Sequence, residues 1–514
     1  MNCKPELVRA ADYFSTDHLR TGLRTRALRG VSATLIAQAS IFGAGIVGSV
    51  ILARLLTPAD FGLVTMVLSF GMVLQSFGST GFIEATIQRE EVDDKQISTV
   101  FWIGLTLSLF LTLLFMALAP AIAWFYNEPR LKPIVLAFAG SILLAGLSTQ
   151  HQALLKRNMQ FYRVSAYETA ATFISLAVAI TLAFWGWGYW ALVARWVVSP
   201  LVITAGAWIS CGWRPGLPAI GSGVRPMLRF AFNTYGNYLL GYFGKTMDKI
   251  LLGRFQGSHL LGNYDRAYQL ANALPLQLLS ALTGVAISAF SRLSNNPEKY
   301  RHVYLTTLST IAFVCMPLSA VLTLAGGDLI LWLLGPQWST AGRVFSVFGS
   351  SIGVLSIYFT HAWLHLSLGT PDRWFRWGLF AFAITLVLLV IGLRFGVVGV
   401  AIGYSASLYI LTGPGLWYAA RPIRLGIAFI LSATWKYFIS ALAAALLAWL
   451  ILYEFSATSN LFQGLTVSMR ILVAGSVCVS FYLALILALY QGVRPITQLN
   501  SFLREMIPGF YREK

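Results

Sequence analysis

Charged side chains are scarce in this sequence. They make up 11% of its 514 residues, whereas 57% are hydrophobic and the mean hydropathy is +0.70. A soluble domain of ordinary composition has about 25% charged residues. The polar surface is therefore too small to cover a water-exposed globule. This composition excludes an ordinary soluble protein and indicates a chain that folds in a lipid bilayer.

Cysteine is also rare. The four residues are scattered and form no C-x-x-C pair: Cys3, Cys211, Cys315 and Cys478. This spacing excludes a disulfide framework and a thiolate zinc site. We expect no cleavable signal peptide, because about thirty polar and basic residues precede the first long apolar run.

Long polar loops are missing as well. No connection between the apolar runs is long enough to hold a soluble catalytic domain. We therefore expect that the protein is not an enzyme and that it works between its helices. A membrane-embedded enzyme stays an alternative, although such enzymes need a sizeable loop outside the bilayer.

Fourteen apolar runs are present, each close to the roughly 20 residues that a spanning helix needs. They lie near 31–53, 61–83, 97–123, 133–155, 164–186, 189–210, 230–252, 266–290, 303–326, 342–366, 374–394, 397–420, 433–453 and 469–490. Charged residues interrupt the seventh and eighth runs. The sequence predicts an all-α integral membrane protein.

The net charge is +18, from 37 Lys and Arg residues against 19 Asp and Glu residues. Most of the basic residues fall in alternate connections, on the side that carries the N-terminus. The positive-inside rule then predicts that both termini are cytoplasmic and that the number of spans is even. This pattern explains the charge better than nucleic-acid binding does, so no nucleic-acid partner is expected.

An internal repeat links two distant connections. The stretch LARLLTPADFG at 52–62 aligns without gaps on LGRFQGSHLLG at 252–262, and Leu, Arg and Gly coincide two hundred residues apart. One copy joins runs 1 and 2, and the other joins runs 7 and 8. Six spans between equivalent points give the two halves the same orientation, which describes a parallel repeat. Two such lobes leave a cleft that works by alternating access.

The motifs resemble those of a known family. ILARLLTPADFGL, the following GSTGFIEATIQ, DKILLGRFQGSHLLGNYDRAYQLANALP and LGPQW are similar to Wzx-type polysaccharide flippases. These belong to the multidrug/oligosaccharidyl-lipid/polysaccharide (MOP) exporter superfamily. The resemblance is greatest to the exopolysaccharide and colanic-acid exporter branch. The alternatives are a multidrug exporter of the same superfamily and a membrane glycosyltransferase or polysaccharide polymerase.

The resemblance implies two six-helix lobes plus two C-terminal helices. The expected organisation is a basic cytoplasmic segment, an N-lobe, a C-lobe, helices 13–14 and a cytoplasmic tail, at 1–30, 31–229, 230–424, 425–492 and 493–514. It also implies transfer of an undecaprenyl-diphosphate-linked oligosaccharide across the bacterial inner membrane, for exopolysaccharide or lipopolysaccharide synthesis. Implied partners are this substrate, membrane lipids and the polysaccharide polymerase machinery. No cofactor is implied beyond coupling to H⁺ or Na⁺.

Buried cations suit an anionic diphosphate cargo. Lys245, Asp248 and Lys249 are three and four residues apart, so they share one face of run 7. Asp265 and Arg266 begin run 8 and could join the same network. Intramembrane charges are costly and default to a functional hypothesis, with a structural ion pair as the alternative.

Further charges lie in other runs. Arg195 is a lone cation between Trp190 and Trp196 in run 6, and Glu168 in run 5 could pair with it. Arg54 and Arg254 are equivalent in the repeat, and either could line the outer mouth or extend to headgroups. The predicted cationic cavity comprises Arg54, Arg195, Lys245, Lys249, Arg254 and Arg266. The candidates for ion coupling are Glu84, Glu168 and Asp248.

Two histidines share a face of run 10. His361 and His365 are four residues apart, but no glutamate or cysteine completes a metal site. Packing or hydrogen bonding to glycan hydroxyls explains them better, so no metal is expected. Tyr235, Tyr238 and Tyr242 in run 7 could stack on sugars.

Overall fold

The computed structural model describes residues 23–77, 81–89, 91–219, 223–454, 456–492, 495 and 497–499. The side chains of 23–33, 77, 232–234, 236–241, 245, 274, 278, 281 and 456–459 are also outside the description. The arginines of the predicted N-terminal segment, the tail after residue 492, and the side chains of Tyr238 and Lys245 therefore lie outside the described residues. Across the described part the chain is helical and contains no strand.

The helices follow the apolar runs. They are α1 (Leu23–Leu55), α2 (Pro58–Phe77), α3 (Phe82–Gln88), α4 (Asp94–Tyr126), α5 (Leu131–Arg157), α6 (Phe161–Phe184), α7 (Tyr189–Ser210), α8 (Arg225–Arg292), α9 (Pro297–Leu334), α10 (Ser339–Ser367), α11 (Pro371–Leu393), α12 (Gly396–Ala420), α13 (Ile427–Trp449), α14 (Ser456–Gln463) and α15 (Val467–Tyr490).

The all-α membrane fold is confirmed. Counted over the described residues, 12 helices are long and apolar enough to cross a membrane, and each coincides with a predicted run. The two remaining runs fall in α8, where charged residues lower the hydropathy. Residue Gly257 inside α8 has φ 79° and ψ 177°, so two helices meet there. The count of fourteen spans stays a prediction.

Three details differ from the sequence prediction. The run at 61–83 ends as a helix at Phe77, and a separate short helix, α3, follows. Helix α14 follows a π-helical turn after α13 and was not predicted. Helix α1 begins at Leu23, inside the segment expected to precede the first span. Short helices at span ends carry too few apolar residues for a periodicity signal.

The chain forms two compact units, Met1–Gly262 and Asn263–Lys514. The division falls inside α8, whereas the sequence places the lobe boundary before residue 230. The first arm of α8 packs on α2, because the hydroxyl of Tyr235 donates to the Val73 carbonyl at 2.8 Å and that of Tyr242 to the Leu68 carbonyl at 3.0 Å. These two hydroxyls thus bind α2, and the stacking of their rings on sugars stays a prediction.

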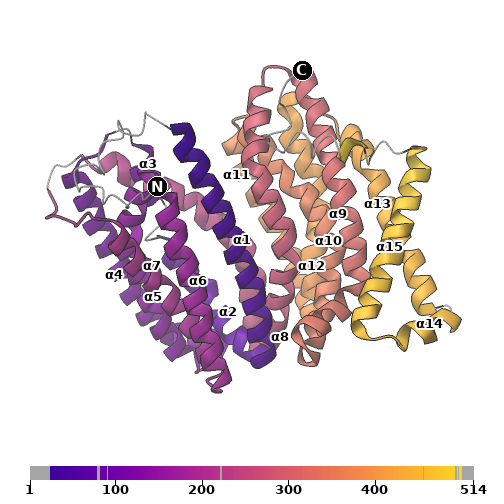
Figure 1. Cartoon of the computed structure of the whole chain (residues 1–514), viewed down its shortest axis with the longest axis horizontal. Coiled ribbons are helices and arrows are strands. Elements are labelled where there is room, and N and C mark those ends of the chain that lie inside the picture. The colour runs from indigo at the N-terminus through magenta and orange to yellow at the C-terminus, as the bar shows by residue number, and fades with distance from the viewer. Residues whose placement is uncertain are drawn as a thin grey trace, which may run out of the picture. The chain divides into compact units, whose positions relative to one another are not determined.

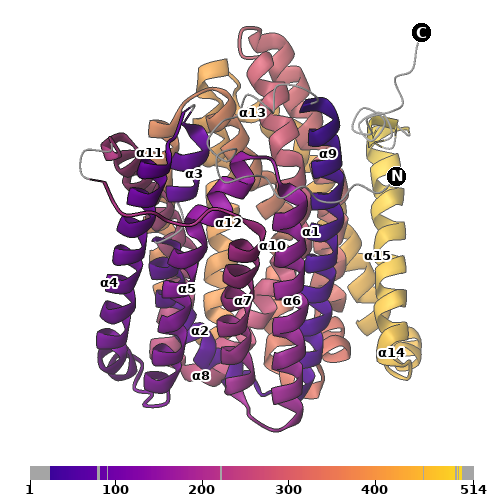
Figure 2. The same cartoon turned by 60° about the vertical axis from the view of Figure 1, so that its left-hand side comes forward.

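Each unit is a helical bundle. In the first unit α4 packs on α5 and α6 on α7 (Figure 1). In the second unit α10 packs between α9 and α12, and α13 and α15 cover α9, as Figure 2 also shows. Its core includes fully buried tyrosines whose hydroxyls bind across helices, such as Tyr304 with Thr360 at 2.9 Å.

The repeat extends further than the sequence indicated. The α5–α6 turn and the α10–α11 turn match at a spacing of 210 residues. The amide of Gln160 donates to the Leu155 carbonyl at 2.9 Å, and that of Thr370 to the His365 carbonyl at 2.9 Å. The residue before each amide, Met159 or Gly369, has a positive φ of 53° or 64°. The same turn also ends other helices of the chain, so the match supports the predicted repeat only together with its equivalent spacing in the two units.

The repeated turns place equivalent arginines. Arg163, in the first turn of α6, donates to the Ser210 carbonyl at 3.0 Å at the end of α7. Arg373, in the first turn of α11, donates to the Tyr418 carbonyl at 2.6 Å near the end of α12. Each arginine therefore satisfies an orphan carbonyl at a helix C-terminus, where a cation is also favoured by the helix dipole.

Candidate functional site

The two copies of the sequence repeat meet in the first unit. Helix α1 ends at Leu55, and α2 is capped by Asp60, whose carboxylate accepts from the Thr57 amide at 2.9 Å and from its hydroxyl at 2.6 Å. The break at Thr57 corresponds to the non-helical Gly257 in α8. Both hairpin motifs therefore change direction at the same repeat position.

The contact between the motifs is reciprocal. A Cβ atom added to Gly62 would collide with the carbonyl of Ser258, and one added to Gly262 would collide with the carbonyl of Pro58. Residues 58 and 258, like 62 and 262, are equivalent in the repeat. Only glycine allows backbones to approach this closely. The site is thus framed by a pseudo-symmetric backbone contact.

Arg54 and Arg254 flank this contact and are both exposed. The guanidinium of Arg254 lies 6.0 Å from the ring centre of Phe125 and 5.8 Å from that of Phe255. Arg54 ends α1 and also has an interaction partner. The exposure of both residues fits an outer mouth and equally fits contact with headgroups.

The predicted face of run 7 contains a deeply buried charge. Asp248 is 3% exposed, and its carboxylate accepts from the Lys249 amide at 2.8 Å. Lys249 is half-buried, and both residues have further interactions. Burial of a carboxylate beside a lysine is costly unless both are well solvated by polar groups. Asp248 therefore requires polar groups around its carboxylate.

Asp265 and Arg266 form an ion pair with each other. The guanidinium and carboxylate are 2.9 Å apart, with the two side chains 11% and 1% exposed. The same carboxylate accepts from Gln269 at 2.8 Å. Asp265 and Arg266 belong to the second unit, whereas Asp248 and Lys249 belong to the first.

Arg195 and Glu168 are both half-buried, on α7 and α6. The charged group that acts on the Glu168 carboxylate is Lys156, at the end of α5. Arg195 has its own interaction with the chain. The structure thus supplies a partner for Glu168 other than the one that the sequence suggested.

Glu84 has a clear structural role. It stands in the first turn of α3, where its carboxylate accepts from the Gly81 amide at 2.6 Å and completes a capping box. Its side chain is exposed. This accounts for the residue as a helix cap, a function that needs no transported ion.

Both histidines form hydrogen bonds within the chain. His361 shares a hydrogen bond of 2.6 Å with the Tyr358 carbonyl, and His365 one of 3.0 Å with the Thr370 hydroxyl. The His365 ring stacks with Trp374 at 6.5 Å. Within the described residues, no group of three His, Cys, Asp or Glu side chains could hold a metal. The packing interpretation accounts for both histidines.

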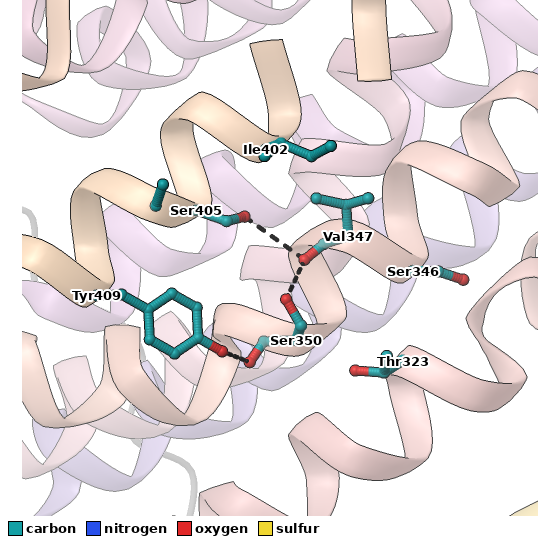
Figure 3. A pocket seen from close by; sticks show the side chains of 8 residues that line it. Thr323, Ser346, Val347, Ser350, Ile402, Ser405 and Tyr409 are labelled. Atoms are coloured by element: carbon teal, nitrogen blue, oxygen red, sulfur yellow. Dashed lines mark hydrogen bonds between the residues drawn. The ribbon is translucent and has the colours of Figure 1, made fainter. Parts of the chain in front are cut away.

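A cavity of about 440 Å³ lies in the second unit between α9, α10 and α12 (Figure 3). Its hydroxyl groups are turned to backbone carbonyls: Ser350 donates to Val347 at 2.7 Å, and Tyr409 to Ser350 at 2.7 Å. The groups left facing the cavity are mainly apolar. None of the predicted site residues lines this cavity, so it is not the cationic site.

Sequence reasoning missed the arginines that join helix ends. Arg157 is 6% exposed and donates to the Thr86 carbonyl at 3.2 Å, which ties α5 to α3. The sequence shows Arg163 and Arg373 only as basic residues of the predicted connections. A search for a second repeat spacing would have found the latter pair, because His151, Leu154 and Arg163 recur as His361, Leu364 and Arg373.

A solved structure has a similar fold. The solved structure of Lipid II flippase MurJ, in an inward closed conformation, matches with a TM-score of 0.70 and covers 90% of this chain and 99% of that chain. At 16% sequence identity, this similarity is one of fold. It confirms the predicted MOP-type architecture.

Sequence comparison then gives the family. The profile of the Polysaccharide biosynthesis protein family matches residues 51–343, which is more than half of the 514-residue chain. The chain belongs to this family, and the predicted resemblance is confirmed.

Two relatives illustrate the similarity. Lipopolysaccharide biosynthesis protein WzxC of Escherichia coli (strain K12) is 24% identical over 409 residues, which cover 78% of this chain and 82% of that protein. Succinoglycan biosynthesis transport protein ExoT of Rhizobium meliloti (strain 1021) is 24% identical over 328 residues, which cover 64% of this chain and 66% of that protein.

Proposed function

We propose that this protein is a flippase for a lipid-linked oligosaccharide. It moves undecaprenyl-diphosphate-linked repeat units from the cytoplasmic to the outer leaflet of the bacterial inner membrane, for exopolysaccharide or lipopolysaccharide synthesis. The observation that carries this proposal is membership of a polysaccharide biosynthesis family by a chain with a MOP-type membrane fold. A relative named as a transport protein of succinoglycan biosynthesis supports transport over catalysis.

The cargo's diphosphate requires cations in a polar cavity. We assign this role to Arg195 and Lys249, which are half-buried within apolar helices. Arg54, Arg254, Arg266 and Lys245 complete the proposed set. A guanidinium or ammonium group in a low-dielectric setting attracts phosphate more strongly than it would in water.

The reciprocal glycine contact suggests how access alternates. The contact of Gly62 with Ser258 and of Gly262 with Pro58 closes the two hairpins on each other. We propose that this is the outer closure and that it separates when the cargo is released. Because the glycines contribute no side chains to this contact, the two hairpins can separate there without breaking side-chain interactions of these residues.

Asp248 is our leading candidate for ion coupling, because it is a carboxylate buried to 3% exposure on the same helix as Lys249. Glu168 is second, and Glu84 is weaker because it caps α3. Coupling would use H⁺ or Na⁺. We further propose that both termini are cytoplasmic and that a polysaccharide polymerase receives the cargo.

A leaflet-resolved lipid measurement tests the function. Undecaprenyl-linked glycans are extracted from a deletion strain, after treatment of spheroplasts with a membrane-impermeant reagent that oxidises exposed sugars. We expect complete repeat units that the reagent does not oxidise, because they face the cytoplasm. The plasmid-borne gene should restore polymer synthesis. Truncated glycans would instead indicate a transferase. Complete but unpolymerised units in the outer leaflet would indicate a polymerase.

A further inference from the structure

Two arginines lie over two aromatic rings at the end of the second unit where α11 begins and α12 ends, and a third arginine, Arg424, follows in the chain. The guanidinium of Arg373 lies 4.6 Å from the ring centre of Tyr418. That of Arg421 lies 4.0 Å from the ring centre of Trp417 and 6.0 Å from that of Tyr418. Two positive charges therefore share the Tyr418 ring.

The backbone holds a further cation beside them. Residues Arg421–Ile423 form a 3₁₀ turn, and Arg424 follows with a left-handed φ of 52°. Its amide donates to the Arg421 carbonyl at 3.0 Å. Both arginine side chains are thus fixed at their base and exposed at their tips.

These exposed guanidinium groups retain free donors. Among the described residues, neither Arg421 nor Arg424 has a side-chain hydrogen bond or an ion pair. Asp372, the nearest acidic residue in the sequence, is exposed and is likewise in no ion pair with a described residue. A guanidinium has five N–H donors in a planar fork that matches a phosphate group. No described acidic residue of the chain neutralises these arginines, so their donors are available to an anion from outside the chain.

The first unit provides a matched comparison. Arg214 stands 210 residues before Arg424, and its guanidinium is used within the chain. It donates to the carbonyls of Trp208, Cys211 and Trp213 at 3.2, 3.2 and 3.1 Å. The buried Cys211 occupies the position equivalent to Arg421. The shared helix end thus forms without an arginine at that position, and the spare donors of the second unit are not required by the fold.

Apolar side chains that lipid would cover adjoin these residues in the chain. Trp417 is 38% exposed, Phe375 44% and Phe429 61%. Aromatic residues at such positions are typical of the boundary between headgroups and acyl chains. A phosphate at this depth is more readily provided by a membrane lipid than by a soluble anion. Basic pockets between helices near the cytoplasmic leaflet are suited to anionic headgroups.

We propose that Arg421 and Arg424, with Arg373 positioned by Tyr418, form a binding site for the phosphate of an anionic phospholipid. The guanidinium groups bind the phosphate oxygens, and Trp417 and Tyr418 hold two of the cations in place by cation–π contact. This site contains none of the residues assigned to the proposed cationic cavity, and it does not depend on the proposed function.

Native mass spectrometry of the full-length protein tests the site. The probe is phosphatidylglycerol titrated into the detergent-purified protein, with zwitterionic phosphatidylethanolamine as the headgroup control. We expect selective retention of phosphatidylglycerol. R421Q and R424Q should each weaken its binding about five-fold, since one basic residue near an anionic surface contributes about that factor.

Two further variants keep the outcome interpretable. R394Q removes an exposed arginine from the opposite end of α11 and should leave binding unchanged. R421K keeps the charge but loses the planar fork, so an intermediate loss is expected. Each variant's melting temperature without lipid should equal that of the parent.

The proposal is overturned if R421Q and R424Q retain phosphatidylglycerol like the parent, or if R394Q loses as much. It is also overturned if phosphatidylethanolamine binds equally well. Competition by millimolar inorganic phosphate would indicate a soluble-anion site. Competition by undecaprenyl diphosphate at equimolar concentration would assign the site to the transported lipid instead.

Discussion

Gly62 and Ser258 lie in backbone contact, and Gly262 and Pro58 repeat that contact with the roles of the two hairpins exchanged. The sequence copies at 52–62 and 252–262 thus meet around a local pseudo-twofold relationship. A contact of this kind is self-complementary, because each copy supplies both the glycine and the carbonyl that it meets. Side chains at positions 62 and 262 would separate the hairpins.

Gly62→Ala should therefore destabilise the protein and impair export. The added Cβ meets a carbonyl oxygen in the other hairpin, and neither backbone can move without disturbing a helix start. Overpacking of this type costs about 1–3 kcal/mol. The melting temperature of the purified protein and the polymer yield of complemented cells measure the effect.

Gly140→Ala is the matched control, because nothing lies within 4 Å of the added atom in α5. It should be neutral or slightly stabilising, since alanine favours a helix by about 1 kcal/mol over glycine. The double variant of Gly62 and Gly262 should cost less than the sum of the single variants, because both disturb one contact. Strict additivity would show that the two glycines act independently.

Lys249→Ala and Arg195→Ala should stop export and leave the protein in the membrane. Removing either cation takes away an attraction for the diphosphate of the proposed cargo, and the membrane content of each variant reports separately on folding. Export is measured as secreted polymer, and membrane content by immunoblot. Lys249→Arg should restore part of the export, because it keeps the charge.

Normal polymer secretion by both alanine variants would disprove the proposed cationic cavity. Arg394→Ala supplies the control for loss of one exposed charge outside that set and should secrete normally.

The Glu128–Arg130 pair gives a defined pH dependence. Arg130 donates two hydrogen bonds of 2.8 Å to the Glu128 carboxylate and holds the pKa of Glu128 below its ordinary value. The stabilisation is complete above the ordinary glutamate pKa of about 4.3 and is lost as the pH falls through the lowered pKa. Since Arg130 is exposed, the pair contributes at most about 1 kcal/mol.

Glu128→Gln should remove this dependence. Melting temperatures recorded from neutral to acidic pH should fall more steeply for the parent than for the variant at the acidic end. Parallel curves would show that the pair contributes nothing to stability.

Arg470 and Asp328 join α15 to α9 in the second unit. Their charged groups are 2.8 Å apart, and the side chains are 25% and 17% exposed. Asp328→Asn leaves the partly buried Arg470 with a weaker hydrogen-bond partner. The free energy of unfolding should therefore fall by about 1–2 kcal/mol. Limited proteolysis should then cleave near α14 and α15 faster than in the parent.

A double-mutant cycle tests whether the pair itself is responsible. Asp328→Asn combined with Arg470→Gln should cost less than the two single changes together. An additive result would attribute the effect to local packing around Tyr453 and Phe462 instead.

Much of the fold followed from the sequence because membrane spans are set by local composition. Twelve of the predicted runs coincide with helices that satisfy the length and hydropathy of a span. The exceptions have a physical cause. The arms of α8 contain Asp248, Lys249 and Asp265, so their mean hydropathy falls although they remain helical. Helix α3 is too short to show a periodicity of its own.

The site was less predictable, because the partner of a charge is set by packing between distant helices. Glu84 was a candidate for ion coupling, and the structure shows it capping α3. Glu168 has Lys156 as its charged neighbour, and Asp265 binds Arg266 and Gln269. Sequence spacing identified which residues share a helix face, but it could not say which side chains face them.

The sequence by itself determined the membrane environment, the helical class, the repeat at Arg54 and Arg254 and the family resemblance. Each of these depends on composition or on residues close together in the chain. The tertiary structure decided that the repeated hairpins meet through Gly62 and Gly262, and that Arg163 and Arg373 close equivalent helix ends. It also decided that Arg421 bonds to no described side chain or carbonyl through its guanidinium, where the first unit has a buried cysteine. These relationships require helices far apart in sequence to pack together, so no local pattern could specify them.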